Sequence, residues 1–565
     1  MLQRYTRAVR SALTLSPQAL LGHLGRRARN GIVPKIAPLY RRSLSSGARR
    51  LGDDFVRSPE GIEQAGLITD FYDSEYGVCV PGCFEGRFVI MNRELDFGSV
   101  RAIDWQVRAD DGSRQLRRAN LCQLGFLPVA MRSDAEATAR MLADLLPGFE
   151  RASDFSRQSD FSGIWHPYVA SRRLQSLVCT YLLAPDQVLT GALLDRLLNQ
   201  MRFTAQFVLK NLETELGYNH LERNLASLTL YALATKRTPG AISTALHKNF
   251  MQFVESIGSD GVQKERSATY HALTVQSLRT FLALSIWRED EARILREKLT
   301  LAEVSMAALT LGDDLPVLFN DSWHGEGPVT SRYLKTAPVG FHAMPEAGYV
   351  RLAAGPWAAV FDAGAIGPDS TAGHGHPDFL SIEASAGSTR LLVDPGTYHY
   401  ESGARRDDLR AWTAHNGPAF LGAEPVTYVG SFMVGRRCAA VLDEARIEPD
   451  GRQLAAGHLS FDGLTVARRV ELDTDGVLRL IDRWTGAGKR RSRFLVPDTW
   501  QVERLGERLV LRNFELVIEL SWRDADCEIG SCEFSPRYEV AQPCHEIVLT
   551  PKPGRDEAIF TFRPI

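Results

Sequence analysis

The spacing of apolar residues divides the chain into two parts with different periods. From about residue 130 to residue 312, apolar residues recur at steps of three and four, as in the stretch GALLDRLLNQMRFTAQFVLKNLE. Its members Leu194, Leu197, Leu198, Met201 and Val208 would share one face of a helix. Similar stretches follow, separated by short joints with Gly, Pro or Asp, and short joints favour antiparallel neighbours. The sequence therefore predicts a helical domain here.

After about residue 326 the period changes to two. Apolar and polar residues alternate in YVRLAAGPWAAVFDAG, LTVARRVELDTDGVLRLIDRW and RLVLRNFELVIELSW, with turn signals such as Asp475-Gly476 between them. This alternation is typical of antiparallel strands with one face in water. We expect a large β-region, built as a sandwich of long strands. A cleft between the helical and β domains would be the natural ligand site.

Composition narrows the class of protein. A chain of 565 residues is long enough for two or three domains. The 66 Lys and Arg residues nearly balance the 68 Asp and Glu residues, so no global positive field points to nucleic acid. None of the eight cysteines forms a CxxC pair, which argues against a zinc ribbon or a disulfide scaffold. The spacing of Cys79 and Cys83 would permit a bridge.

The N-terminal stretch MLQRYTRAVRSALTLSPQALLGHLGRRARNG is basic and lacks the uninterrupted apolar core of a secretory signal. Its periodic Leu and Ala positions predict one or two basic amphipathic helices. A packed, partly solvated helix is the favoured interpretation, and contact with a membrane surface is the alternative. No later segment has the roughly 20 apolar residues of a membrane span. We therefore expect a soluble protein of the cytoplasm.

Histidines gather in the stretch GHGHPDFLSIEASAGSTRLLVDPGTYHY, which otherwise has the character of β-structure. If His374 and His376 lie on a strand, their side chains point to the same face. Asp394 ends the next apolar strand, and His415 follows in AHN. Two histidines, one carboxylate and a water would complete a tetrahedral zinc shell. The alternative is a set of hydrogen-bonded polar groups in a loop.

Two further groups lie in the helical part. Asn219 and His220, in ELGYNHLERNLASL, would stand at the start of a helix, where an amide and an imidazole could hold a carboxylate or oxyanion. Taken alone, Asn219 is better interpreted as an N-terminal cap. Tyr270 lies within the amphipathic stretch SATYHALTVQSL, where a tyrosine usually packs with its hydroxyl at the surface. It becomes a functional candidate only if it faces the same cleft.

Together these stretches resemble the heparinase II/III-type polysaccharide lyases, a family related to the oligoalginate lyases. GHGHPDFLSIEASAGSTRLLVDPGTYHY is similar to the family's HxHxD stretch and the strand after it. WHPYVASRRL, YNHLERNLASLTLYAL, DGVQKERSATYH and AWTAHNG resemble four other family segments, in the same order. The resemblance extends from about residue 90 onward. It implies an incomplete (α/α) toroid over residues 51–325 and an antiparallel β-sandwich over 326–565, preceded by the basic helical segment 1–50.

The resemblance also implies an activity, namely cleavage of a uronate-containing acidic polysaccharide by β-elimination, as in exopolysaccharide metabolism. Asn219 and His220 would neutralise the uronate carboxylate, Tyr270 would transfer a proton, and His374 would be a second base or acid. The family's structural zinc ligands would match His376, Asp394 and His415. Tyr218 stands where the family more usually has a first asparagine, and Pro377 follows the second histidine; these departures leave the chemistry intact and concern the substrate. Degradative members are secreted, which makes the periplasm the alternative location.

Three other functions stay open. A glycoside hydrolase would need two carboxylates about 5–9.5 Å apart, for which Glu213, Glu215, Glu265 and Asp378 are candidates. A metal-dependent hydrolase could use an HxH site, and a non-catalytic polysaccharide-binding or assembly protein would need no catalytic groups. An acidic substrate also predicts a basic lining of the cleft, with these candidates: Arg172, Arg173, Arg266, Arg405, Arg406 and Arg410.

Overall fold

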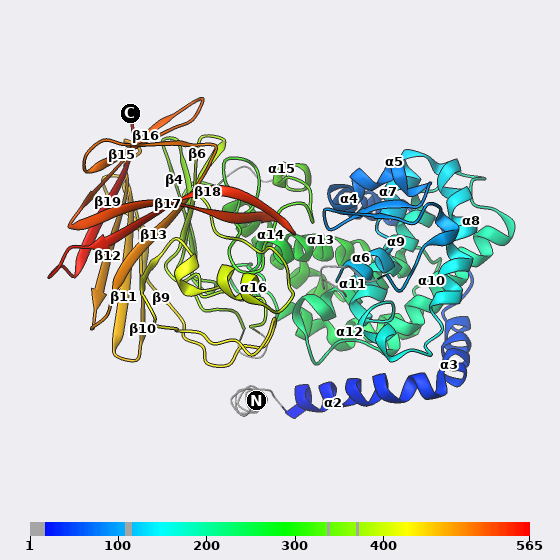
Figure 1. Cartoon of the computed structure of the whole chain (residues 1–565). Coiled ribbons are helices and arrows are strands. Elements are labelled where there is room, and N and C mark those ends of the chain that lie inside the picture. Colours follow the sequence, from blue (N-terminus) through cyan, green and yellow to red (C-terminus); the bar gives the residue numbers. More distant parts are fainter. Residues whose placement is uncertain (1–16, 108–115, 336–338, 369–371) are drawn as a thin grey trace.

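A computed structural model describes residues 17–107, 116–335, 339–368 and 372–565. A helical N-terminal region is followed by a C-terminal region of antiparallel sheets, and the two lie side by side (Figure 1). This confirms the predicted fold class. The helices are α2 (Pro17–Ile32), α3 (Ala37–Arg49), α4 (Pro59–Tyr76), α5 (Val80–Cys83), α6 (Leu116–Gln123), α7 (Phe126–Ser133), α8 (Ala135–Ala152), α9 (Pro167–Leu183), α10 (Gly191–Lys210), α11 (Tyr218–Leu233), α12 (Gly240–Val254), α13 (Ala268–Ala283), α14 (Glu289–Ala308), α15 (Thr330–Tyr333) and α16 (Ala404–Leu409).

The strands include one hairpin in the helical region and three sheets in the β region. They are β1 (Arg87–Ile90), β2 (Arg93–Asp96), β3 (His342–Met344), β4 (Tyr349–Ala354), β5 (Trp357–Asp362), β6 (Ile382–Ala386), β7 (Thr389–Leu392), β8 (Pro418–Phe420), β9 (Val441–Ile447), β10 (Gln453–Phe461), β11 (Leu464–Leu472), β12 (Leu478–Thr485), β13 (Arg490–Pro497), β14 (Gln501–Arg504), β15 (Arg508–Arg512), β16 (Val517–Arg523), β17 (Ala525–Arg537), β18 (Val540–Pro551) and β19 (Glu557–Pro564).

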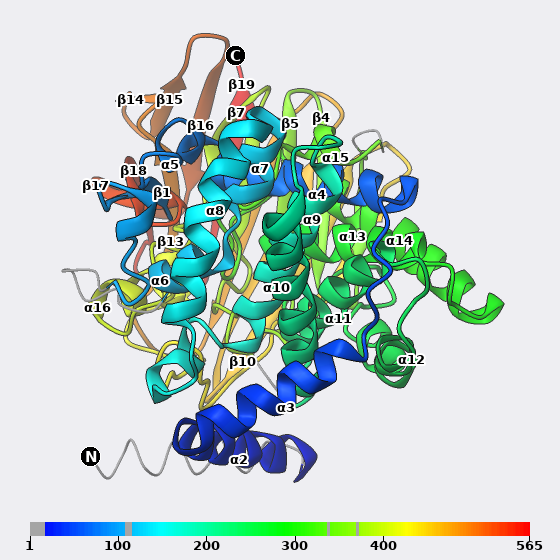
Figure 2. The same ribbon diagram turned by 90° about the vertical axis from the view of Figure 1, so that its right-hand side faces the viewer.

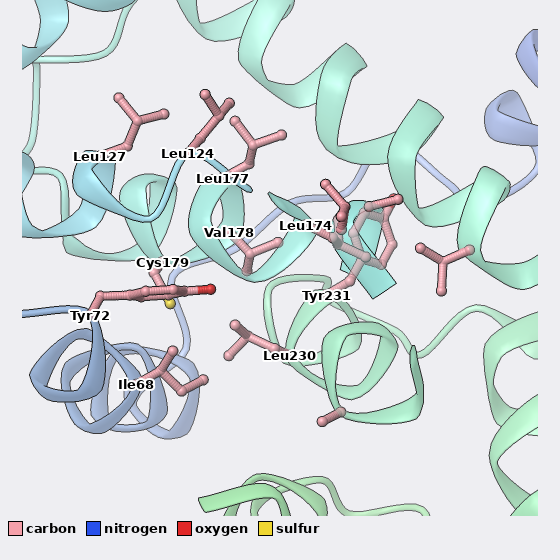
Figure 3. Packing of buried hydrophobic residues seen from close by; sticks show 14 of the residues in the cluster. Ile68, Tyr72, Leu124, Leu127, Leu174, Leu177, Val178, Cys179, Leu230 and Tyr231 are labelled. Carbon is pink, nitrogen blue, oxygen red and sulfur yellow. The ribbon is translucent and has the colours of Figure 1, made fainter. Parts of the chain in front are cut away.

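The helical region is organised around α9, which packs against α4, α6, α7, α10 and α11 (Figure 2). Almost every residue of α9 is buried, as expected for a helix surrounded by others. Figure 3 shows Leu177 and Val178 of α9 together with Tyr72 of α4 and Tyr231 of α11. Inside this core the Tyr72 hydroxyl donates to the carbonyl of Arg172 over 3.0 Å.

The β region has an eight-stranded sheet in the order β14-β15-β16-β19-β12-β11-β10-β9. A four-stranded sheet, β17-β18-β13-β8, and a five-stranded sheet, β3-β4-β5-β6-β7, complete it. Every strand pair within these sheets is antiparallel. In β12, alternate residues from Leu478 to Trp484 are buried, which is the period of two that the sequence shows. The second, fourth and sixth positions of the strand face outward.

The N-terminal segment forms two helices, α2 and α3, that lie against the helical region. Residues 17–31 of the predicted basic helices are therefore helical, and residues 1–16 lie outside the described residues. On α2 the polar side faces inward: Arg26 bonds Glu215, and Arg29 bonds Asn211. Leu20 and Leu24, on the opposite side of the helix, are 40% and 55% exposed. This is the reverse of an ordinary surface helix.

Two remaining expectations concern the membrane and the cysteines. Among the helices that the structure describes, none is long and apolar enough to cross a membrane.

Cys79 and Cys83 are both buried free thiols, so the bridge that their spacing would permit is not formed. The Cys79 thiol instead donates to the carbonyl of Val89 over 2.6 Å.

Candidate active site

A cavity of about 970 Å³ is lined by residues from both regions of the chain. Asn219, His220 and Tyr270 reach it from the helical region, and His374 reaches it from the β region. The structure thus brings together the four side chains for which the sequence predicts catalytic roles. They come from α11, α13 and the loop before β6, so about 150 residues separate the first from the last.

Asn219 presents an unused amide to the cavity. Gly217, with φ of 64°, precedes α11, and Asn219 lies inside the first turn, so the interpretation of Asn219 as the N-terminal cap is wrong. Its backbone N–H donates to Glu265 Oε2 over 3.1 Å. The side chain is only 4% exposed, yet its Nδ2 has no hydrogen-bond partner among the described residues. An unsatisfied buried donor is costly, which indicates a ligand group in the cavity.

His220 is held in place by a buried carboxylate. Its Nδ1 lies 3.1 Å from Glu213 Oε1, and Glu213 also accepts from Arg26 and Asn224. Burial alone would lower the pKa of His220, but the charge and hydrogen bond of Glu213 outweigh burial and raise it. The same contacts hold the pKa of Glu213 far below its usual value, although burial opposes them. His220 is therefore biased toward the imidazolium form.

Tyr270 is buried in the first turn of α13, where Ser267 caps the helix. Its hydroxyl lies 3.0 Å from that of Tyr400, and its ring centroid lies 4.6 Å from that of His374. Burial raises the pKa of Tyr270 well above its usual value, and neighbouring Tyr168 and Glu326 raise it further. The phenol is therefore protonated at neutral pH and suited to donate a proton.

His374 is oriented by a carboxylate behind it. Its Nδ1 lies 3.0 Å from Asp321 Oδ2, and Arg406 donates to the same carboxylate. Burial would raise the pKa of Asp321, but Arg406 and the histidines hold it well below its usual value. Because an ionised carboxylate can only accept, Nδ1 of His374 carries a proton. In the neutral ring, Nε2 is then the basic nitrogen, and it lies 4.0 Å from Glu265 Oε1.

The segment that carries His374 and His376 is a loop, and not the strand considered from the sequence. Strand β6 begins only at Ile382. Gly375 explains the close packing of the loop, because a Cβ there would lie 1.7 Å from the carbonyl oxygen of Ile366. Both imidazoles reach the same carboxylate, since His376 Nε2 lies 3.0 Å from Asp321 Oδ1. The shared acceptor, rather than a strand face, sets their geometry.

The three predicted zinc ligands lie near one another behind this loop. His415 Nδ1 is 2.7 Å from Asp394 Oδ2, and the ring centroids of His376 and His415 are 5.6 Å apart. Within the described residues, His376 Nδ1 and His415 Nε2 are buried without a hydrogen-bond partner. Unpaired imidazole nitrogens beside a carboxylate fit a zinc ion chemically. The donor atoms of these three residues are not all within 4.8 Å of one another. Among the described residues, the group that meets this distance is His166, Glu213 and His220.

Where the structure describes it, the cavity lacks the basic lining that the sequence predicts from six arginines. None of the six arginines predicted from the sequence is among the described residues that line the cavity. Four of them are buried and pair with carboxylates instead: Arg172 with Glu75, Arg266 with Asp362, Arg406 with Asp321, and Arg410 with Asp407. The charged side chains that do line the cavity, besides histidines, are Glu75, Glu265, Glu326, Glu401, Arg437 and Arg537.

Sequence reasoning missed several residues of the site. Tyr400, which ends the histidine-rich stretch, lines the cavity beside Tyr270, and the run Tyr398-His399-Tyr400 was an available signal. Asp321 carried no local signal, and its partner Arg406 was expected to line the cavity rather than to pair behind His374. Of the four carboxylates considered for a hydrolase, Glu265 alone lines the cavity among the described residues.

Comparisons with known proteins agree with this architecture. Residues 336–562 match the family model "Heparinase II/III-like, C-terminal". Heparinase III superposes with a TM-score of 0.66 at 14% identity, over 98% of this chain and 94% of that one. A heparan sulfate lyase from Pedobacter heparinus superposes with a TM-score of 0.54 at 15% identity, over 98% and 91% of the two chains. No curated protein sequence matches the chain. The resemblance to the heparinase II/III-type family is therefore confirmed: residues 336–562 match the model of the family's C-terminal domain, and the chain shares its fold with heparinase III.

Proposed function

We propose that this protein is a carbon–oxygen lyase that cleaves a uronate-containing acidic polysaccharide, such as an exopolysaccharide, by β-elimination. One observation carries the proposal. An amide, an imidazole and a phenol from the helical region line one cavity with an imidazole from the β region. The family of the C-terminal domain and the shared fold support the same reaction.

The first requirement of such a reaction is to neutralise the uronate carboxylate. Removal of the proton at C5 builds charge on that carboxylate, which becomes an enolate-like dianion. The free Nδ2 donor of Asn219 and the imidazolium of His220 are the groups that would bind its oxygens. Loss of one such oxyanion donor costs about 2.7–4 kcal/mol in other enzymes. These two residues therefore make the C5 proton acidic enough to remove.

The second requirement is a base for C5 and an acid for the bridging oxygen. His374 takes the C5 proton on Nε2, because Asp321 holds the proton on Nδ1. The C5–H electrons form the C4–C5 double bond, and the C4–O bond breaks. Tyr270, which is protonated and close to His374, donates its proton to the departing sugar oxygen. Tyr400 then stabilises the tyrosinate through its hydroxyl.

The test is to incubate the protein with a panel of acidic polysaccharides and to follow the ultraviolet absorbance of 4,5-unsaturated uronate ends. Product formation that is lost in Tyr270→Phe and in His374→Ala is the expected result. Tyr181→Phe is the matched control, because Tyr181 packs against Phe55, remote from the cavity lining. New reducing ends without unsaturation would identify a hydrolase, and tight binding without product would identify a binding protein.

We propose further that zinc is held by His376, Asp394 and His415. The unpaired nitrogens of the two histidines support this assignment. Bound zinc would supply a fixed positive charge that holds the loop of His374 against the β region. Elemental analysis of protein purified without added metal tests the proposal, and loss of zinc in Asp394→Asn but not in Asp443→Asn is expected. Asp443 is the control because it pairs with a surface histidine, His458.

We also propose that the outward side of α2 contacts an anionic lipid surface. No Asp or Glu precedes Asp53 in the sequence. Leu20, Leu21 and Leu24 are exposed on α2, with Arg27 exposed beside them. Exposed leucines beside basic residues are typical of helices that lie in a membrane interface.

Sedimentation with vesicles tests this contact. Vesicles containing phosphatidylglycerol should bring down the protein, and pure phosphatidylcholine vesicles should not. Leu21→Asp should abolish the effect, whereas Leu301→Asp, at an exposed leucine of α14, should not. Self-association without lipid binding would show that a second copy covers this side.

A further inference from the structure

We propose that Cys532 and Cys544 are a redox modification site, at which a hydroperoxide joins the two sulfurs in a disulfide. The bond closes the hairpin of β17 and β18, whose tip contributes residues to the cavity. The site is tested without any substrate, so its fate does not depend on the proposed lyase function.

The two cysteines lie directly opposite each other on neighbouring strands. In the antiparallel register of β17 and β18, Cys532 is the partner of Cys544. Opposed residues of such strands have Cα atoms about 4.5–5.5 Å apart, inside the range of about 4.4–6.8 Å that disulfides span. The Sγ atoms are 3.1 Å apart. The backbone therefore needs little movement to form the bond.

A mostly buried arginine prepares Cys532 to react. Arg493 Nη2 donates to Cys532 Sγ over 3.6 Å. The hydrogen bond from Cys544 and the charge of Arg493 lower the pKa of Cys532, although burial opposes them. The contact with Cys532, together with burial, raises the pKa of Cys544. Cys532 is thus biased toward the thiolate, which is the reactive form, and Cys544 keeps its proton.

An oxidant can reach Cys532 from solvent. Strand β17 is at the edge of the four-stranded sheet, and Cys532 is partly exposed there. All eight cysteines lie among the described residues, and Cys438 is the one other that is partly exposed. Cys438 contacts Arg436 over 3.9 Å, whereas Cys532 has a second thiol within reach. Cys544 is buried, so its accessible reaction partner is Cys532.

Two steps form the disulfide with hydrogen peroxide. The Cys532 thiolate attacks one peroxide oxygen and the O–O bond breaks, which leaves a sulfenic acid on Cys532 and a hydroxide that takes a proton from solvent. The Cys544 sulfur then attacks the Cys532 sulfur. The S–S bond forms, the S–O bond breaks, and the departing hydroxide takes the Cys544 proton to become water. Together the two sulfurs lose two electrons, and the peroxide gains them.

The disulfide closes the tip of this hairpin, residues 533–543. Figure 1 shows β17 and β18 extending from the β region toward the helices. At the tip, Arg537 and Tyr538 line the cavity. Glu539 accepts from Arg117 Nη2 of the helical region over 2.6 Å. Oxidation therefore fixes a segment that joins the two regions of the chain beside the cavity.

The experiment uses the full chain. Reduced protein is treated with hydrogen peroxide, free thiols are blocked with N-ethylmaleimide, and the protein is digested with trypsin. Trypsin cleaves after Arg523 and Arg537, so Cys532 and Cys544 fall in different peptides. We expect these two peptides to be linked, with the loss of two hydrogen atoms, and to separate on addition of dithiothreitol. Absence of the linked peptides from the oxidised protein overturns the proposal.

Single substitutions assign the role of each sulfur. In Cys544→Ala the sulfenic acid has no thiol to attack it, so dimedone should label Cys532. In Cys532→Ala the label on Cys544 should be at least about tenfold weaker, because the thiolate is the reactive form. Cys438→Ala is the matched control and should still form the disulfide, since Cys438 is partly exposed but lies outside the pair. Equal labelling of Cys544 and Cys532 would overturn the assignment of Cys532 as the nucleophile.

Hydrogen exchange tests whether the bond closes the hairpin tip. The amide hydrogens of residues 533–543 should exchange more slowly in the oxidised protein, because a closed loop opens less readily. Peroxide-treated Cys532→Ala is the control and should exchange as the untreated variant does. Equal exchange in the oxidised and reduced unsubstituted protein would overturn this effect on the tip.

Discussion

The hydroxyl oxygens of Tyr270 and Tyr400 lie 3.0 Å apart, although 130 residues separate them in the sequence. Tyr270 belongs to the helical region and Tyr400 to the β region, so this hydrogen bond joins the two regions inside the cavity. The Tyr400 backbone N–H donates to the hydroxyl of Tyr538 over 2.9 Å, which fixes its position. Tyr400 can thus stabilise a tyrosinate that forms when Tyr270 gives up its proton.

Tyr400→Phe should therefore lower kcat by about tenfold, with little change in KM. Tyr270→Phe removes the acid itself and should cost about 10²–10⁴-fold. Initial rates at saturating substrate measure both effects, and circular dichroism checks the fold. A Tyr400→Phe variant as inactive as Tyr270→Phe would show that Tyr400 is the acid.

Periodicity predicted the two parts of the fold, and the resemblance of short segments to a known family predicted the residues that gather in the cavity. Apolar residues spaced three and four apart around Leu197 mark the buried face of α10. The alternation around Leu480 marks the buried face of β12. Asn219, His220, Tyr270 and His374 stand in recognisable segments. The resemblance of these segments to the family, and not their local pattern alone, singled out these side chains.

The remaining features depend on contacts that local sequence does not encode. Asp321 orients His374 from 53 residues away, and nothing around Asp321 marks it. The six predicted arginines were assigned to the cavity by charge alone, whereas pairing with carboxylates decides where Arg172, Arg266 and Arg406 lie. The HxH loop resembled a strand because its irregular path depends on Gly375 passing close to Ile366.

Removal of the proposed zinc ion should lower thermal stability together with activity. Chelation would leave His376 and His415 with buried nitrogens that lack partners, so the loop of His374 should loosen. We expect a drop in Tm of several degrees and loss of activity, both restored by added zinc. Activity that vanishes while Tm is unchanged would instead favour a metal-dependent hydrolase.

Arg266 connects the helical and β regions through a buried ion pair with Asp362. Asp378 lies nearby, and burial together with the charge of Asp362 raises its pKa well above the usual value. Arg266→Met would leave these two carboxylates without their cation, which should cost about 3–5 kcal/mol of unfolding free energy. Urea unfolding measures the change. Arg483→Met, at an exposed pair with Glu557, is the control and should be nearly neutral.

Glu213→Gln should shift the pH dependence of kcat/KM. Burial lowers the pKa of His220, and Glu213 is the main group that raises it. Without that charge the pKa of His220 falls. The imidazolium that binds the uronate then loses its proton at a lower pH than in the unchanged protein. The alkaline limb of the profile should therefore move to lower pH. A limb that stays in place would mean that His220 acts as a neutral donor.

Arg26→Gln should shift the pKa of His220 in the direction opposite to that of Glu213→Gln. Arg26, from the N-terminal helix, bonds Glu213, and its positive charge lowers the pKa of His220. Removal of that charge should raise the pKa and move the alkaline limb to higher pH, opposite to the effect of Glu213→Gln. Arg27→Gln is the control, because Arg27 is exposed one residue further along α2. Shifts in the same direction for Arg26→Gln and Glu213→Gln would indicate displacement of α2, since a purely electrostatic effect requires opposite signs.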